Sequence, residues 1–105
     1  MCSTRVLAWK EQTVVSECVE CLHMNIWHAN LLLNFSRNEF LSFKKVINSL
    51  NFWDHSHPFP DGSERIILRT PNSDISFTFE ETDFELFKQA VDEAIYMSEV
   101  YALMR

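Results

Sequence analysis

Residues 31–50, with the sequence LLLNFSRNEFLSFKKVINSL, decide the predicted fold because they join a strand to a helix. Over the first five positions, Leu31, Leu33 and Phe35 lie on one face of a strand, as expected for a half-buried strand. Ser36 and Glu39 then form the Ser-x-x-Glu pattern of a capping box, which starts a helix. The residues that follow include an apolar stripe of helical period, formed by Phe40, Phe43, Val46, Ile47 and Leu50.

A second strand precedes this stretch, and the whole pattern recurs later in the chain. Residues 22–27 alternate between apolar and polar, so with the strand at 31–35 they predict a hairpin. Phe40 and Phe43 recur as Phe84 and Phe87, each 44 positions later, after a second predicted hairpin with strands at 65–70 and 74–80. A second capping box, Thr82-x-x-Glu85, predicts the start of the second helix. We therefore predict two copies of a strand–strand–helix unit.

These units predict a single α+β domain over residues 1–105. One such unit leaves its apolar sheet face open to water, whereas two can close one core between them. We expect one antiparallel sheet with two helices on one face, and pseudo-twofold symmetry between the halves. The predicted parts are an N-terminal hairpin at 1–17, a first unit at 22–51, an irregular loop at 52–63 and a second unit at 65–105.

Charge and composition exclude several classes of function. The net charge is −6, so the chain repels a phosphate backbone and we expect no nucleic-acid partner. No stretch has the 18 or so apolar residues that span a bilayer, so we expect no membrane span. Gly62 is the only glycine. Phosphate-binding loops and nucleophile elbows need several glycines, so most nucleotide-dependent enzymes are disfavoured.

The cysteines indicate a compartment and suggest a metal site. Their odd number fits reduced thiols in the cytoplasm better than a disulfide framework. Cys18 and Cys21 have the spacing of metal ligands, and Cys2 is the third cysteine. His23 lies two residues after Cys21, and His55 and His57 lie in the irregular loop, so histidine ligands for zinc are also present in the sequence. A zinc site of Cys18, Cys21, His55 and His57 is one hypothesis, and thiols at a strand junction without metal are the alternative.

Exposed apolar residues predict contacts with a partner. Trp27 lies on the strand face opposite the core residues, where it either anchors a partner or is covered by another part of the chain. The last helix carries a second apolar strip that includes Leu86, Met97 and Tyr101, and such a helix is rarely left in water. We therefore expect a homodimer, formed through this helix or through a sheet edge.

The run from Cys18-x-x-Cys21 to Glu39-Phe40 resembles a family of short uncharacterised bacterial proteins. The shared features are a CxxC, a Leu-rich hairpin and a Ser-x-x-Glu-Phe helix start, over about residues 18–50. The resemblance implies the fold and no activity.

Three hypotheses for the function follow. The first is a non-enzymatic protein-interaction module that acts as a homodimer. The second is a small zinc-binding domain that uses Cys18 and Cys21 with the loop histidines. The third is a small-ligand binder or enzyme centred on His55 and His57, because two imidazoles beside Asp54 and Asp61 resemble a general acid–base set.

Overall fold

The computed structural model describes residues 3–104, which form two antiparallel sheets and three helices. The first sheet is a four-stranded meander in the order β1-β2-β3-β4, and the second is a three-stranded meander in the order β5-β6-β7. The strands are β1 (Thr4–Lys10), β2 (Thr13–Cys18), β3 (Met24–His28), β4 (Leu31–Phe35), β5 (Ser56–Pro58), β6 (Glu64–Arg69) and β7 (Ser76–Phe79). The helices are α1 (Arg37–Ser49), α2 (Phe52–His55) and α3 (Glu81–Leu103).

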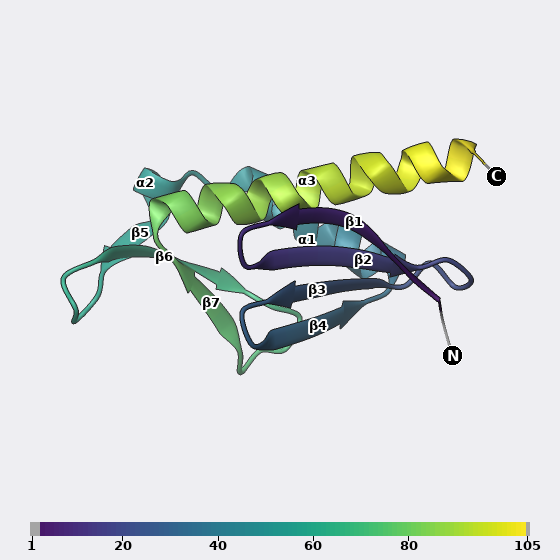
Figure 1. The fold of residues 1–105 in the computed structure, drawn as a ribbon. Coiled ribbons are helices and arrows are strands. Elements are labelled where there is room, and N and C mark those ends of the chain that lie inside the picture. Colours follow the sequence, from purple (N-terminus) through teal and green to yellow (C-terminus); the bar gives the residue numbers. More distant parts are fainter. Residues whose placement is uncertain (1–2, 105) are drawn as a thin grey trace.

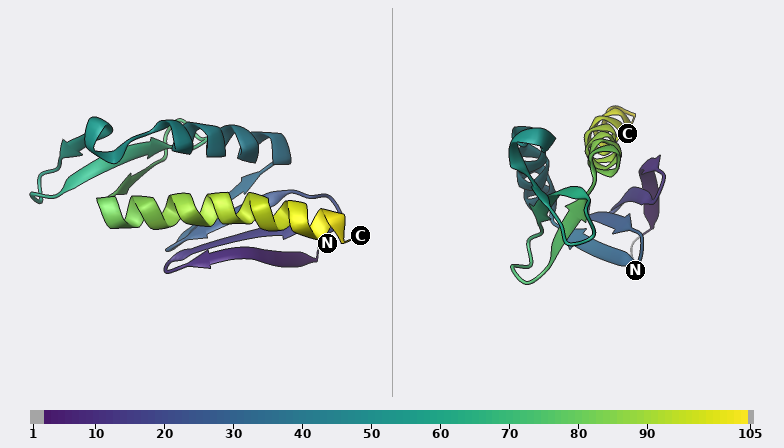
Figure 2. Two further views of the ribbon diagram at one scale, coloured as in Figure 1. Left: turned by 90° about the horizontal axis from the view of Figure 1, so that it is seen from above. Right: turned by 90° about the vertical axis from the view of Figure 1, so that its left-hand side faces the viewer.

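The two long helices lie side by side on the same face of the four-stranded sheet (Figures 1 and 2). Helix α3 runs along strands β1 and β2 and extends over the smaller sheet, where it contacts β6 and β7. The molecule is elongated, with extents of 48 × 23 × 23 Å. No helix in residues 3–104 combines the length and the apolarity needed to span a bilayer. The opposite face of β1–β4 carries neither of the long helices (Figure 2).

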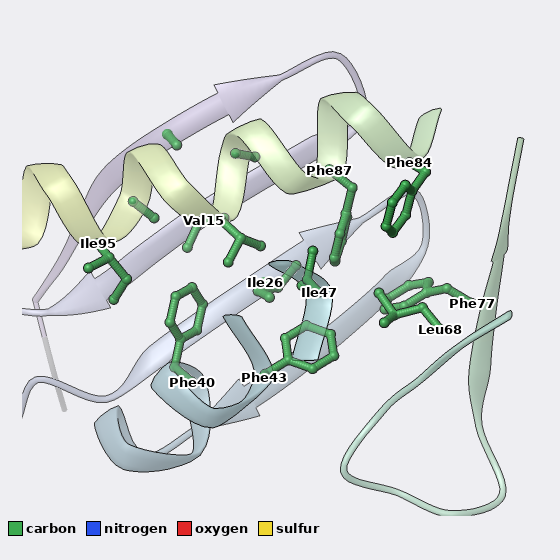
Figure 3. Packing of buried hydrophobic residues seen from close by; sticks show 14 of the residues in the cluster. Val15, Ile26, Phe40, Phe43, Ile47, Leu68, Phe77, Phe84, Phe87 and Ile95 are labelled. Atoms are coloured by element: carbon green, nitrogen blue, oxygen red, sulfur yellow. The ribbon is translucent and has the colours of Figure 1, made fainter. Parts of the chain in front are cut away.

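Apolar side chains from both sheets and all three helices form one buried cluster. Figure 3 shows Val15 and Ile26 of the four-stranded sheet facing Phe87 of α3 and Ile47 of α1. Phenylalanine dominates this cluster, and the rings of Phe79 and Phe87 are 4.8 Å apart between centroids. Such ring pairs add about 0.5–1.5 kcal/mol each beyond the area that they bury. The core therefore joins the two sheets into one structure.

The prediction of an α+β fold is confirmed, and the prediction of a single sheet is wrong. The predicted loop at 52–63 contains α2 and β5, and β5 forms the edge of a separate sheet by pairing with β6. Asn51 starts α2, because its side-chain oxygen accepts the amide hydrogens of Trp53 at 3.1 Å and Asp54 at 3.4 Å. Phe52 is buried in the core, which holds this segment against the domain.

The two helices begin differently. Ser36 and Glu39 form the predicted capping box at α1, with N–O distances of 3.2 Å and 2.7 Å. The second predicted capping box is wrong, because α3 starts at Glu81 and its N-cap, Glu80, makes no side-chain capping bond. Strand β7 ends at Phe79, so α3 follows it almost directly. Ile75, just before β7, lies outside the strand and is exposed.

Both predicted units do have the order hairpin, then helix. Helix α1 starts at Arg37 and α3 at Glu81, which keeps the spacing of 44 residues seen in the sequence. The paired phenylalanines Phe40 and Phe84 are both buried. The hairpins belong to different sheets, however. Internal duplication and pseudo-twofold symmetry remain predictions.

Candidate functional site

The outer face of the four-stranded sheet carries a row of apolar side chains that crosses all four strands. Strand register places Trp9 of β1 beside Val14 of β2, Val14 beside Trp27 of β3, and Trp27 beside Leu32 of β4. We call these four residues the tryptophan row. Three of its members are largely exposed, at 69% for Trp9, 55% for Trp27 and 60% for Leu32. The row is therefore an aromatic and aliphatic surface in contact with solvent.

A second row of residues lies beside the tryptophan row. Register places Val6, Ser16, Asn25 and Asn34 side by side across the same four strands. Together with Thr4 and the tryptophan row, they line a shallow depression of about 540 Å³. None of these described residues is charged, although the whole chain has a net charge of −6. The outer face is thus an uncharged surface on an acidic protein.

A β-bulge produces the tryptophan row. The pairing of β1 with β2 shifts between Val6 and Ala8, so that Leu7 is an extra residue in β1. A bulge changes which residues share a face, because successive strand residues otherwise alternate between faces. Val6 and Trp9 therefore share the outer face although they are three residues apart. Leu7 and Ala8 are both buried on the inner side.

The helix residues predicted to contact a partner are mostly used within the chain. Met97 and Tyr101 are half-buried and pack against the core. The guanidinium carbon of Arg5 lies 4.0 Å above the centre of the Tyr101 ring, a cation–π contact. Leu86 is half-buried as well. Of the four predicted contact residues, Trp27 is the one that the structure leaves widely exposed.

A buried polar network lies on the inner face of the sheet, below α3. The Glu17 side chain is fully buried and accepts hydrogen bonds from Arg5 Nη2 at 3.1 Å and from Ser98 Oγ at 2.8 Å. Arg37 of α1 donates to the same Ser98 oxygen at 2.8 Å. The network therefore connects β1, β2, α1 and α3. Arg5 compensates the buried carboxylate directly, since an unpaired buried carboxylate would be strongly unfavourable.

Residues 18–23 form a tight turn between β2 and β3. The Cys18 amide donates to the His23 carbonyl at 2.9 Å, and the Leu22 amide donates to the Cys18 carbonyl at 2.9 Å. The Cys21 amide points at Cys18 Sγ at 3.4 Å, and His23 Nδ1 lies 3.2 Å from Cys21 Sγ. A Glu20 carboxylate oxygen lies 3.2 Å from Cys18 Sγ. Two sulfur atoms, an imidazole nitrogen and a carboxylate thus gather at one turn.

The structure changes two predictions about the cysteines. Cys18 is in a disulfide, so the prediction that all three cysteines are reduced thiols is wrong here. Cys2 lies outside the described residues.

The CxxC turn and the histidine segment with His55 and His57 lie at opposite ends of the long molecule (Figure 1). One ion cannot bind all four residues of the predicted zinc site. Residues 3–104 contain no group of three or more His, Cys, Asp or Glu arranged to hold a metal ion.

The loop histidines are exposed and take part in local structure. His55 Nδ1 lies 2.9 Å from the carbonyl oxygen of Asn51, the residue that starts α2. His57 pairs with Arg65 across the β5–β6 ladder. Asp61 accepts hydrogen bonds from Ser63, and these lower the pKa of its carboxyl group below the usual value. The structure therefore assigns turn and strand contacts to this segment.

Comparison with known proteins gives a family. A family of unknown function, DUF6686, matches residues 1–101. The chain belongs to this family. The match extends the predicted resemblance to an uncharacterised family from residues 18–50 to almost the whole chain. No curated protein and no solved structure matches the chain significantly.

Sequence reasoning identified Trp27 but missed its neighbours. In the sequence, Leu32 lies on the strand face opposite Leu31 and Leu33. Alternation in β3 and β4 is a sequence signal that could have paired Trp27 with Leu32. No such signal places Trp9 beside them, because the bulge in β1 interrupts the period of two.

Proposed function

We propose that the protein is a protein-interaction module that forms a homodimer through the outer face of sheet β1–β4. The observation that carries the proposal is the uncharged tryptophan row, exposed across four strands. A second copy of the same chain is the proposed occupant.

The size of the apolar surface supports an interface. A tryptophan side chain covers up to about 250 Å². With exposures of 69% and 55%, Trp9 and Trp27 alone present on the order of 300 Å² to water. Leu32 and Val6, at 60% and 53% exposed, extend this patch. Contiguous patches of roughly 300–600 Å² are the largest found on typical monomers and are often functional.

The charge distribution favours a second copy over a basic partner. Two chains of net charge −6 repel each other wherever their acidic surfaces meet. The outer face is where this repulsion is smallest, because no described residue lining its depression is charged. A basic partner would gain its electrostatic attraction on the acidic remainder of the surface instead. The face is therefore suited to association with an equally acidic chain.

Geometry is also compatible with a symmetric pair. Two sheets pack face to face about 10 Å apart, with strand directions within about 30° of each other. In a dimer with a two-fold axis, the same patch lies on both sides of the interface. Trp27 lies on an inner strand of the sheet, so each copy contributes it near the centre of the contact. Central aromatic residues supply most of the binding energy in such interfaces.

Sedimentation velocity over a concentration series tests the proposal. We expect the wild-type chain to sediment at twice the monomer mass of 12.4 kDa at micromolar concentration. Trp27→Ala is expected to weaken the dimer by about 30-fold or more, the effect of losing a hot-spot residue worth about 2 kcal/mol.

Trp53→Ala is the matched control, because Trp53 is 62% exposed but lies on α2, away from the outer face. It should leave the dimer unchanged, and circular dichroism should show that both variants remain folded. A wild-type monomer at about 100 μM, or equal weakening by the two substitutions, would contradict the proposal.

A further inference from the structure

We propose that a groove between α1 and the end of β6 binds a free α-amino acid with a large apolar side chain. Its lining includes Glu39, Phe43 and Val46 of α1 on one side and Arg69, Thr70 and Pro71 on the other. We call it the α1 groove. Its volume of about 570 Å³ lies within the range of roughly 300–1,000 Å³ that small-molecule sites occupy. None of these six residues lines the depression on the outer face of β1–β4, so the site is independent of the proposed dimer.

The α1 groove has an apolar lining that the core leaves uncovered. Val46 belongs to the apolar stripe of α1, yet it is 51% exposed, because it lies beside the groove and not in the core. Phe43 also lines the groove, and its ring stacks on Phe35 at 5.1 Å and contacts Phe87 edge-on at 6.2 Å between centroids. Pro71 adds a third apolar surface. An apolar side chain in this groove is stabilised, because its surface and the lining both leave water.

One carboxylate and one guanidinium line the groove, and they come from different elements. Glu39 belongs to α1 and Arg69 to the end of β6. Within residues 3–104 neither side chain is in an ion pair, so the two charges do not neutralise each other. Hydrogen bonds from Ser36 lower the pKa of the Glu39 carboxyl group, and the Ser36 amide donates to its Oε1 at 2.7 Å. Glu39 is therefore an anion at neutral pH with a second oxygen to accept a donor, and Arg69 is a permanent cation.

The turn between β6 and β7 gives the groove a rigid side. Thr70 is buried, and its amide donates to the Ile75 carbonyl at 3.3 Å. Its hydroxyl donates to the same carbonyl at 2.7 Å and accepts the Asn72 amide hydrogen at 3.2 Å. The ring of Pro71, between these residues, fixes its own backbone φ angle. A lining that is ordered before the ligand arrives lowers the entropic cost of binding.

A zwitterion matches these charges better than a simple acid or a simple amine does. An α-amino acid carries one ammonium group and one carboxylate at neutral pH. The ammonium group donates to Glu39, and the planar Arg69 guanidinium pairs with the carboxylate. A monocarboxylic acid would be repelled by Glu39, and an amine would be repelled by Arg69. A large apolar side chain then covers the lining formed by Phe43, Val46 and Pro71.

Titration of the nitrogen-15-labelled full chain with L-phenylalanine tests the proposal by NMR. We expect saturable amide shifts centred on residues 38–46 and 69–71, described by one site. L-Phenylalanine amide lacks the carboxylate and N-acetyl-L-phenylalanine lacks the ammonium group, so each should bind about tenfold more weakly or worse. Arg69→Gln and Glu39→Gln should cause similar losses, and glutamine at position 39 preserves the capping box. Lys45→Gln is the matched control, because Lys45 is an exposed cation of α1 that does not line the groove.

Three results would overturn the inference: no saturable shifts with L-phenylalanine up to about 10 mM, equal affinity for the two analogues, or equal loss in Lys45→Gln and Arg69→Gln. The same spectra show whether each variant is folded, which separates loss of the site from loss of the fold. Sedimentation of the same samples distinguishes this proposal from that of the dimer. The dimer should form with or without L-phenylalanine, since the groove and the outer face share no lining residue.

Discussion

Truncation of Glu17 to alanine is expected to be far more destabilising than truncation of a surface glutamate. Glu17 is fully buried, and its carboxylate accepts hydrogen bonds from Arg5 and Ser98 at 3.1 Å and 2.8 Å. Alanine at this position removes both acceptors and leaves two donors without their partner below α3. The Arg5 guanidinium would then lack its compensating carboxylate.

The structure sets the size of the effect. Removing one partner of a buried ion pair costs about 3–5 kcal/mol. The Arg5 side chain is 26% exposed, so water recovers part of its lost interaction and we expect about 3 kcal/mol, the lower end of this range. For a domain of this length, each kcal/mol lowers the melting temperature by about 4–8 °C. The expected decrease is therefore about 12–24 °C.

Chemical denaturation in urea measures the loss, with Glu93→Ala as the matched control. Glu93 pairs with Lys10 at 3.4 Å, and both side chains are more than a third exposed, at 43% and 36%. Such a surface pair contributes about 0–1 kcal/mol. Glu17→Gln should fall between the two variants, because the amide keeps the size and an acceptor oxygen but loses the charge. Equal losses below about 1 kcal/mol for Glu17→Ala and Glu93→Ala would refute the assigned role of the network.

Two further predictions concern a histidine and a turn. Burial lowers the pKa of His28, with the Asp83 carboxylate opposing this shift. The unfolded chain then binds more protons than the folded one just below its pKa of about 6.5, so stability should fall as the pH drops through that value. His28→Gln should flatten this part of a urea-midpoint profile against pH, and a slope unchanged by the substitution would contradict the assignment. Ala29 has a φ of 54° in the β3–β4 turn, so Ala29→Gly should stabilise the fold by roughly 0.5–1 kcal/mol. A lower denaturation midpoint for Ala29→Gly would show that the turn is not strained.

The spacing of apolar residues predicted helices and strands well in segments where a single period, of two or of about 3.6 residues, is clear. The strand at 31–35 and the capping box at Ser36 agree with the structure. The core phenylalanines at 40, 43, 84 and 87 are buried as the helical spacing predicts. These features depend on neighbours three or four residues apart, which a sequence displays directly.

The spacing of apolar residues did not predict the structure where pairing between separate strands determines it. Segment 52–63 was predicted to be an irregular loop, yet Phe52 is buried and residues 56–58 pair with β6. The sequence also gives no sign that this pairing produces a second sheet. Edge pairing depends on which strand is close in space, and short edge strands tolerate proline. The position of Trp9 was missed because the bulge in β1 interrupts the alternation of the strand.

The sequence by itself determined the α+β class, the hairpin and helix order and the main core residues. These follow from periodicity and from residue chemistry, which need no knowledge of distant contacts. Only the tertiary structure decided that β5, β6 and β7 form a separate sheet, that a bulge aligns Trp9 with Trp27, and that the CxxC turn lies far from His55 and His57. Each of these depends on how separate strands pack and pair. The hydrophobic effect is non-directional, so a sequence pattern shows which residues are buried but not which distant segments bury them.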